Sequence, residues 1–270
     1  MGAKQPLRAI LHSIMSDYMD LLSDALEFLG GKPVVDDNEI KYGPLVLSVA
    51  PKHGKATSLL ADHLFSPSIF LAERIERGLL GCEGKTALEL GAGAALPSLL
   101  LSTLPNPPKL LVITDHPDEA IYGNLRKVVS RNQATAHPTC KVIAQGYAWG
   151  EDPSSLLALL PFDNSSGFEV MILSDLLHFD SCHDLLVFSV TTLLKKAPES
   201  VVHVSAGVYT KPDVCDSFIK KIETAGLHIE EVISDPQEPW MGTLHVSGLD
   251  ANDLALRKAN CRYWVARWAA

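Results

Sequence analysis

The chain has 270 residues, 47% of them hydrophobic, and a formal net charge of -9 at pH 7, which suits one large α/β domain with a full core. The acidic balance argues against nucleic acid as a partner, because few cations are available to neutralise phosphates. No apolar run reaches the roughly 18 residues that span a membrane and no cleavable leader pattern is present, so we expect a cytoplasmic protein.

Apolar residues from Pro6 to Leu29 recur at steps of three and four and end at a glycine pair, which predicts an amphipathic helix. This helix either packs on the core or on a second subunit of a homodimer, or it forms a lid over a substrate pocket. Residues 34–49 are expected to be irregular chain ending in a short strand, Leu45 to Val49. We therefore divide the chain into an N-terminal helical extension or lid, residues 1–55, and a second unit, residues 56–270.

The second unit alternates helices with strands. Residues 56–80 are helical by pattern, with a break at Pro67. The expected strands are Thr86 to Leu90, Leu110 to Asp115, Cys140 to Ala144, Phe168 to Leu173, Val201 to Val208 and His228 to Ile233, and the later helices are Ala94 to Leu101, Glu119 to Asn132, Ser181 to Lys196 and Pro212 to Ala225.

The end of the chain breaks this alternation. Residues 240–253 contain turn residues and are expected to form a loop, so the last strand, Arg262 to Trp268, follows without a helical crossover and inserts antiparallel. The whole pattern predicts an α/β fold of the Rossmann-like kind, with a seven-stranded, mostly parallel sheet, helices on both faces and the last strand antiparallel.

A glycine turn, Glu89-Leu-Gly91-Ala-Gly93, follows the first expected strand. It lacks the lysine and Ser/Thr of a P-loop and the third glycine of a dinucleotide fingerprint. The remaining pattern, Glu-x-Gly-x-Gly, is seen where S-adenosylmethionine (SAM) binds, with a carboxylate in reach of an amino or ammonium group. An ordinary strand-to-helix turn is the alternative.

Polar and aromatic residues stand at or just beyond the ends of the other strands, where ligands bind in a doubly wound sheet. Asp115 would accept both ribose hydroxyls of SAM and would repel a phosphate, unless it serves as a helix N-cap. Tyr147 and Trp149 offer a flat wall for adenine, or else belong to the core. Ser174 would meet the methionine portion through its backbone, and Asp175 would close the site or cap the next helix.

Four stretches carry a family resemblance: Leu88-Glu-Leu-Gly-Ala-Gly-Ala-Ala-Leu-Pro-Ser-Leu-Leu100, Thr114-Asp-His116-Pro-Asp118, Gly146-Tyr-Ala-Trp-Gly150 and Ile172-Leu-Ser-Asp-Leu-Leu177. They resemble the seven-strand lysine methyltransferase family, and most of all its fungal nicotinamide N-methyltransferase-like branch, some of whose members methylate elongation factor 1-alpha. The resemblance implies that residues 56–270 are a SAM-dependent methyltransferase domain. It implies SAM binding by Glu89, Gly91, Gly93, Asp115, Trp149 and Asp175, and His116, Tyr147 and Ser174 belong to the same strand ends.

The acceptor side departs from the family pattern. Leu64-Phe-Ser-Pro67 stands where members usually have a tryptophan motif, and His178-Phe-Asp180 follows Asp175 where an aromatic, an asparagine and a histidine are usual. After the fifth strand, residues 207–212 replace a His-Arg-Pro element.

The catalytic candidates lie in or next to these stretches that depart from the family pattern. His178 or His183 could take a proton from an acceptor, with Asp180 holding the tautomer, and Tyr209 ends the next strand. Ordinary polar loop residues that cap a helix are the alternative. The spacing is not that of a zinc site and the five cysteines form no CxxC pair, so we expect no metal.

Three enzymatic functions remain open from the sequence, besides a pure binding role without catalysis. The first is methyl transfer from SAM to a nitrogen or oxygen of a small molecule, with His178 or Tyr209 removing or orienting the acceptor proton. The second is methylation of a protein lysine or N-terminal amine, as in enzymes of the elongation-factor type. The third is a biosynthetic reaction without methyl transfer, such as cyclisation or dehydration, on a fold that has kept SAM only as a bound cation or has lost it.

Overall fold

The computed structural model describes residues 39–51, 55–60, 64–161, 166–233, 235 and 237–269. The helix expected over residues 6–29 lies outside this part, so its role as a lid or dimer contact stays a prediction. Among the described residues no helix is long and apolar enough to cross a membrane.

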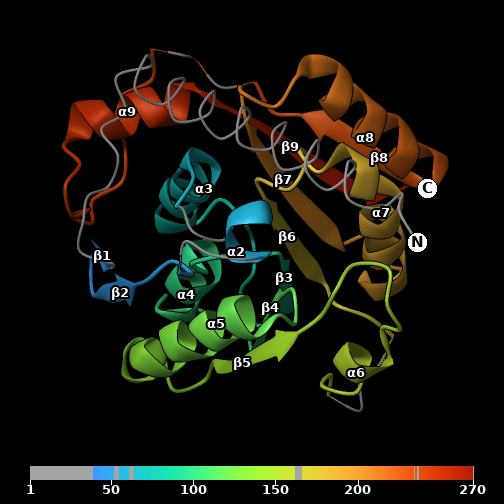
Figure 1. The fold of residues 1–270 in the computed structure, drawn as a ribbon, viewed down its shortest axis with the longest axis horizontal. Coiled ribbons are helices and arrows are strands. Elements are labelled where there is room, and N and C mark those ends of the chain that lie inside the picture. The colour runs from blue at the N-terminus through green and yellow to red at the C-terminus, as the bar shows by residue number, and fades with distance from the viewer. Residues whose placement is uncertain are drawn as a thin grey trace, which may run out of the picture.

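A seven-stranded sheet forms the centre of the molecule, in the order β5-β4-β3-β6-β7-β9-β8 (Figure 1). Neighbours from β5 to β7 pair in parallel, whereas β9 is antiparallel to both β7 and β8. The strands are β3 (Thr86–Leu90), β4 (Leu110–Asp115), β5 (Lys141–Gly146), β6 (Val170–Ser174), β7 (Val201–Gly207), β8 (Leu227–Glu231) and β9 (Cys261–Trp268). The predicted Rossmann-like α/β fold with an antiparallel last strand is confirmed.

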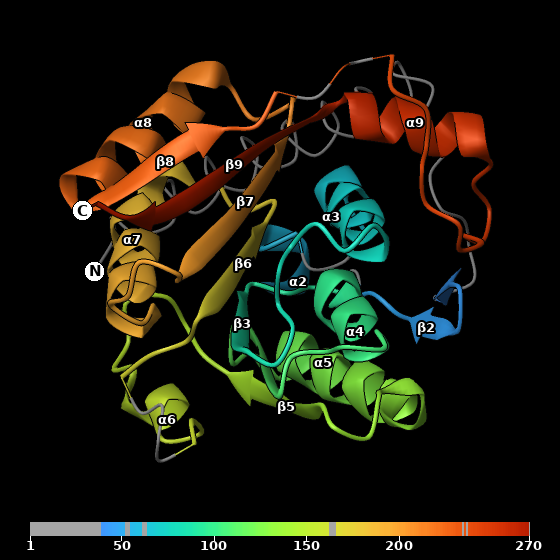
Figure 2. The ribbon, with the colours of Figure 1, turned by 180° about the vertical axis from the view of Figure 1, so that it is seen from behind.

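Helices cover both faces of this sheet (Figures 1 and 2). Successive strand residues point to opposite faces, so each apolar strand supplies two cores. On β3, for example, Ala87 packs with residues of one group of helices and the next residue, Leu88, with residues of a second group on the opposite face. The first group is α3 (Ser66–Glu76), α4 (Leu96–Ser102) and α5 (Glu119–Asn132), the second is α7 (His183–Leu193) and α8 (Pro212–Thr224), and two short helices are α2 (Lys55–Ser58) and α6 (Ser154–Leu157).

The structure corrects two expectations about local structure. Residues 240–253 were expected to be a loop leading directly to the last strand, but α9 (Ala251–Ala259) forms before β9. Its start is a capping box, in which the Asp250 side chain accepts hydrogen bonds from the backbone of Asn252 and Asp253. Residues 40–42 were expected to be irregular but form β1 (Ile40–Tyr42), which pairs in a hairpin with the expected strand, β2 (Leu45–Leu47).

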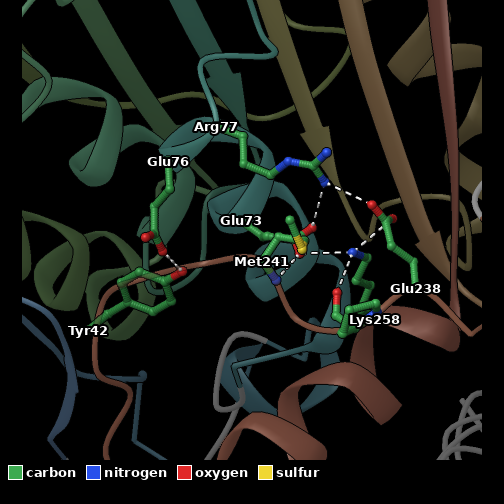
Figure 3. A network of polar contacts seen from close by, with 8 residues as sticks. Tyr42, Glu73, Glu76, Arg77, Glu238, Met241 and Lys258 are labelled. Atoms are coloured by element: carbon green, nitrogen blue, oxygen red, sulfur yellow. Dashed lines mark hydrogen bonds and ion pairs between the residues drawn. The ribbon is translucent and has the colours of Figure 1, made fainter.

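A buried polar network ties α3 to α9 and to the chain between β8 and α9 (Figure 3). Lys258 Nζ lies 2.8 Å from Glu73 Oε1 and 2.9 Å from Glu238 Oε2, and the Lys258 side chain is only 3% exposed. One turn further along α3, Glu76 accepts a hydrogen bond from the Tyr42 hydroxyl at 2.6 Å. The network thus anchors the helix whose other end faces the cavity described next.

Candidate functional site

A cavity of about 350 Å³ opens at the carboxyl ends of β3, β4 and β6. The chain runs from β3 to β4 and β5 on one side and then returns to β6 on the other, so the winding of the sheet reverses between β3 and β6. Ligands of doubly wound folds bind at such a reversal, and the volume is in the usual range for a ligand site.

The glycine turn after β3 forms the floor of the cavity. Gly91 and Gly93 have φ values of +60° and +54°, in the left-handed region that glycine adopts at little cost. A Cβ at Gly91 would lie 2.7 Å from a methyl carbon of Leu176, whereas a Cβ at Gly93 would meet nothing within 4 Å. The backbone at Gly93 is therefore open to a ligand.

Glu89 lies beneath this turn and does not line the cavity. Its side chain is fully buried, and Oε2 accepts a hydrogen bond from the Ser98 backbone at 3.2 Å, in the first turns of α4. Oε1 has no hydrogen-bond partner in the described part of the chain. Burial raises the pKa of this carboxyl to about 8. Glu89 thus braces the turn from below.

Asp115 ends β4 and lines the cavity. Its Oδ2 accepts from the Gly93 N–H and its Oδ1 from the His116 N–H, both at 2.7 Å. Burial raises its pKa to about 6, against the opposing effect of these two hydrogen bonds. The alternative role as N-cap of α5 is taken by Asp118, whose side chain accepts from the Ala120 backbone.

His116 also lines the cavity, next to Asp115. Its Nδ1 accepts a hydrogen bond from the Asp118 N–H at 3.2 Å, which places the ring proton on Nε2 in the neutral form. Burial and the nearby charge of Lys55 lower the pKa of this histidine. The ring is therefore an uncharged part of the wall.

Tyr147 and Trp149 form an aromatic wall after β5. Tyr147 is 3% exposed, and its hydroxyl shares a hydrogen bond of 3.0 Å with Ser189 Oγ on α7. Trp149 meets Phe179 edge to face, with ring centroids 5.7 Å apart. Both predicted aromatic residues therefore line the cavity, while Tyr147 also contacts Ser189 and Trp149 also contacts Phe179.

The opposite end of the cavity holds Ser174, Asp175 and His178, which follow β6. Ser174 Oγ shares a hydrogen bond of 2.9 Å with Ser68 Oγ on α3. Neither ring nitrogen of His178 makes a hydrogen bond of normal geometry within the described part of the chain, and burial lowers its pKa. His178 is thus a neutral imidazole with an unused acceptor nitrogen beside a cavity.

The donor set of the cavity fits SAM. Carboxylates line it, an aromatic wall flanks it, and an open glycine backbone approaches it, whereas no lysine or arginine of the described ranges contributes to the lining. Within that described lining a phosphate-bearing cofactor meets carboxylates and no cation, while a sulfonium ligand with a ribose finds acceptors. The described residues also hold no group of side chains that could bind a metal ion.

Residues 58–225 match the family model described as lysine methyltransferase. The chain belongs to the lysine methyltransferase family. It is accordingly a SAM-dependent methyltransferase, as its sequence predicted.

Curated relatives of this methyltransferase agree with the family. The protein N-terminal and lysine N-methyltransferase EFM7 of Gibberella zeae is 34% identical over 181 residues, which cover 64% of this chain and 68% of that protein. The protein of the same name in Schizosaccharomyces pombe is 30% identical over 185 residues, 67% of this chain and 70% of that one. Among solved structures, a methyltransferase from Pyrococcus furiosus aligns with 82% of this chain and 88% of its own, at 15% identity and a TM-score of 0.45.

Three predicted catalytic residues of the methyltransferase do not line the cavity. Asp180 is exposed and accepts a hydrogen bond from the Ser181 backbone at 2.7 Å. His183 is buried, with Nε2 at 2.8 Å from the Leu177 carbonyl and its ring edge to face with a core phenylalanine. The Tyr209 hydroxyl donates to Asp175 from behind the cavity wall. Of the four residues predicted as catalytic, His178 alone contributes to the lining.

Sequence reasoning missed part of the wall. Phe65 and Ser68, at the start of α3, and Phe179 and Leu185, beyond β6, line the cavity but were not among the predicted site residues. One signal was present, because Phe65 lies in the four-residue stretch that departs from the family's tryptophan motif. Phe179 likewise lies in the His178-Phe-Asp180 stretch that departs from the family pattern, whereas Ser68 and Leu185 carry no motif and reach the cavity only through the fold.

Proposed function

We propose that this methyltransferase transfers the methyl group of SAM to a protein amine, either a lysine side chain or an N-terminal amine. The names of two relatives that are at least 30% identical over about two thirds of their length support this acceptor. They favour the second of the three functions that the sequence left open. The small-molecule acceptor, which the sequence placed first, gains no support from these relatives.

The cavity divides into a cofactor end and an acceptor end. At the cofactor end, the backbone of Gly91 and Gly93 would face the cofactor, Asp115 would accept the ribose hydroxyls, and Trp149 and Tyr147 would flank the adenine. His116 and Ser174 would complete this end, and Asp175 stands where the two ends meet. SAM supplies a methyl group made electrophilic by the positive sulfur, so the protein's part is to position and deprotonate the acceptor.

The acceptor end suits an amine that must lose a proton. Only the neutral amine has a lone pair, whereas a lysine ammonium has an ordinary pKa of about 10.4 and an N-terminal amine about 7.7. The rings of Phe65 and Phe179 disfavour a charged amine by desolvation. His178, neutral and with an unused ring nitrogen, would take the proton, and Asp175 would stabilise the imidazolium that results.

Incubation of the purified protein with tritiated SAM and a cell lysate tests this function. We expect label in a discrete protein band, and mass spectrometry of that band to show methyl groups on a lysine or on the N-terminal nitrogen. The Asp175→Asn variant should lose the label, while Asp184→Asn, an exposed aspartate on α7, should keep it. Label that appears solely in the small-molecule extract would contradict a protein acceptor.

A further inference from the structure

Tyr209 stands behind the acceptor end of the cavity. It lies in a tight turn after β7, in which the Thr210 N–H donates to the Gly207 carbonyl at 3.0 Å. Its ring folds back over Gly207, where an added Cβ would lie only 2.2 Å from the ring. The ring also lies near Phe65, a residue of the cavity wall, with centroids 6.3 Å apart. The Tyr209 ring thus lies against Gly207 and next to the cavity wall.

From this position Tyr209 reaches Asp175, the lining carboxylate that stands where the two ends of the cavity meet. Its hydroxyl donates to Oδ2 of Asp175, and the Gly207 N–H donates to Oδ1 at 3.3 Å. The Asp175 N–H donates in turn to the Ser205 carbonyl of β7 at 2.8 Å. Both oxygens and the backbone of Asp175 are therefore held by β7 and by the turn that follows it.

The backbone of Asp175 is itself unusual. Its φ of +63° lies in the left-handed region, which is costly for a residue that carries a Cβ. Residues kept in such conformations cluster at functional sites, where the surroundings fix them. Here the surroundings are the hydrogen bonds from the β7 turn, which fix a carboxylate against the cavity.

Charged and titratable groups surround this carboxylate on several elements. His178 faces it from the loop after β6, and the His178 imidazolium and the Asp175 carboxylate favour each other. Tyr209 faces it from the turn, Cys261 interacts with it from β9, and Arg257 of α9 lies near Tyr209 and Cys261. Burial raises the pKa of Asp175, while His178, the Tyr209 hydroxyl and the Gly207 amide oppose that rise.

We infer that Tyr209 is a positioning residue: its hydroxyl holds the Asp175 carboxylate in place beside His178, so that Asp175 can stabilise the proton that His178 takes from the acceptor amine. This inference rests on the proposed function for the identity of the acceptor, but its central contact is independent of any acceptor. It also reassigns Tyr209, which the sequence suggested as a group that handles the acceptor proton itself.

The titration of His178, followed by NMR of the histidine ring signals, tests the contact directly. The signal is assigned by its loss in His178→Gln, and Asp175→Asn shows how far the titration moves when the carboxylate charge is gone. In Tyr209→Phe we expect the His178 pKa to fall toward the Asp175→Asn value by about half a unit or more, because a carboxylate that the hydroxyl no longer holds moves away from the imidazolium that it stabilises. Tyr122→Phe, on α5 and outside the cavity lining, should leave it unchanged.

A His178 titration in folded Tyr209→Phe that stays at the wild-type value or rises would overturn the inference. Gly207→Ala supplies a second variant, because its Cβ would displace the Tyr209 ring while the hydroxyl remains in the chain. We expect the same downward movement there, and an unchanged titration would again contradict the role.

Transfer of tritium to lysate protein gives the catalytic counterpart. Tyr209→Phe should lower the rate at saturating SAM about tenfold, while the dissociation constant for SAM, measured by calorimetry, stays within about twofold of wild type. An unchanged rate would overturn the positioning role. Absence of protein label in the wild type would instead refute the proposed acceptor and leave the NMR result standing.

Discussion

Replacement of Asp115 by alanine is the sharpest test of where the cofactor lies. The Asp115 carboxylate lines the cavity, is 9% exposed and accepts two backbone N–H groups at 2.7 Å each. In the proposed complex it accepts both ribose hydroxyls as well. Two hydrogen bonds to a charged acceptor, at about 1.5 kcal/mol each, amount to about 3 kcal/mol, which corresponds to about 100-fold weaker binding of SAM.

Calorimetry with SAM measures this loss, and Asp118→Ala is the matched control. Asp118 lies three residues away and caps α5 with a 3.0 Å hydrogen bond from the Ala120 backbone, but it does not line the cavity. Its loss should reduce stability by about 1 kcal/mol and leave SAM affinity unchanged. An Asp115→Ala protein that binds SAM within a few-fold of wild type, or an equal loss in Asp118→Ala, would refute the ribose role.

The pH dependence of SAM binding tests the contact between Asp115 and the ribose independently. Because burial raises the pKa of Asp115 to about 6, the free protein carries the carboxylate above that pH and a neutral acid below it. The ribose hydroxyls need the charged acceptor, so affinity should fall as the pH drops through about 6. In Asp115→Asn this acid limb should be missing.

Three further predictions concern stability and the glycine turn. Lys258→Met should cost about 3 to 5 kcal/mol of unfolding free energy in urea, because it leaves the buried Glu73 carboxylate without its lysine cation. Arg131→Met, at a surface pair with Glu39 in which Arg131 is 39% exposed, should cost less than about 1 kcal/mol. Burial lowers the pKa of His203 to about 4 from its ordinary value of 6.5. The contribution of the neutral His203 to the free energy of unfolding is therefore complete above pH 6.5, and about 2 kcal/mol of that contribution is lost between pH 8 and pH 5. His203→Gln should remove that part of the acid dependence. Gly91→Ala should weaken SAM binding in calorimetry because its Cβ would lie 2.7 Å from a leucine methyl, whereas Gly81→Ala, with a φ of +62° and open space around it, should cost stability alone.

The sheet could be predicted because its strands are continuous apolar runs bounded by turn residues. Thr86–Leu90 and Leu110–Asp115 form strands with the expected limits, and Glu119–Asn132 is helical as expected. The same reasoning placed Gly91, Gly93 and Asp115 at one edge of the sheet, because parallel strands present their carboxyl ends together. α9 was missed because the turn residues before it outweighed the Asp250 to Asp253 capping box.

The acceptor end could not be predicted to the same depth. His178 and His183 are five residues apart and chemically alike in the sequence, but the short helical turn between them brings one ring to the cavity and buries the other against α8. Likewise no pattern shows that Tyr209 lies behind Phe65, since more than one hundred residues separate them. Such contacts depend on side-chain direction within the folded molecule.

The placement of β9 between β7 and β8 has a consequence for the order in which the sheet assembles. Within the described part of the chain, β8 pairs with no strand but β9, although β8 comes earlier in the sequence. During synthesis α8 and β8 therefore leave the ribosome before β9, the strand that pairs β8 with the rest of the sheet, has been made. Until β9 arrives, the free edge of β7 is exposed and the apolar face of α8 lacks part of its partner surface, so this is the stage at which a nascent chain would most need a chaperone.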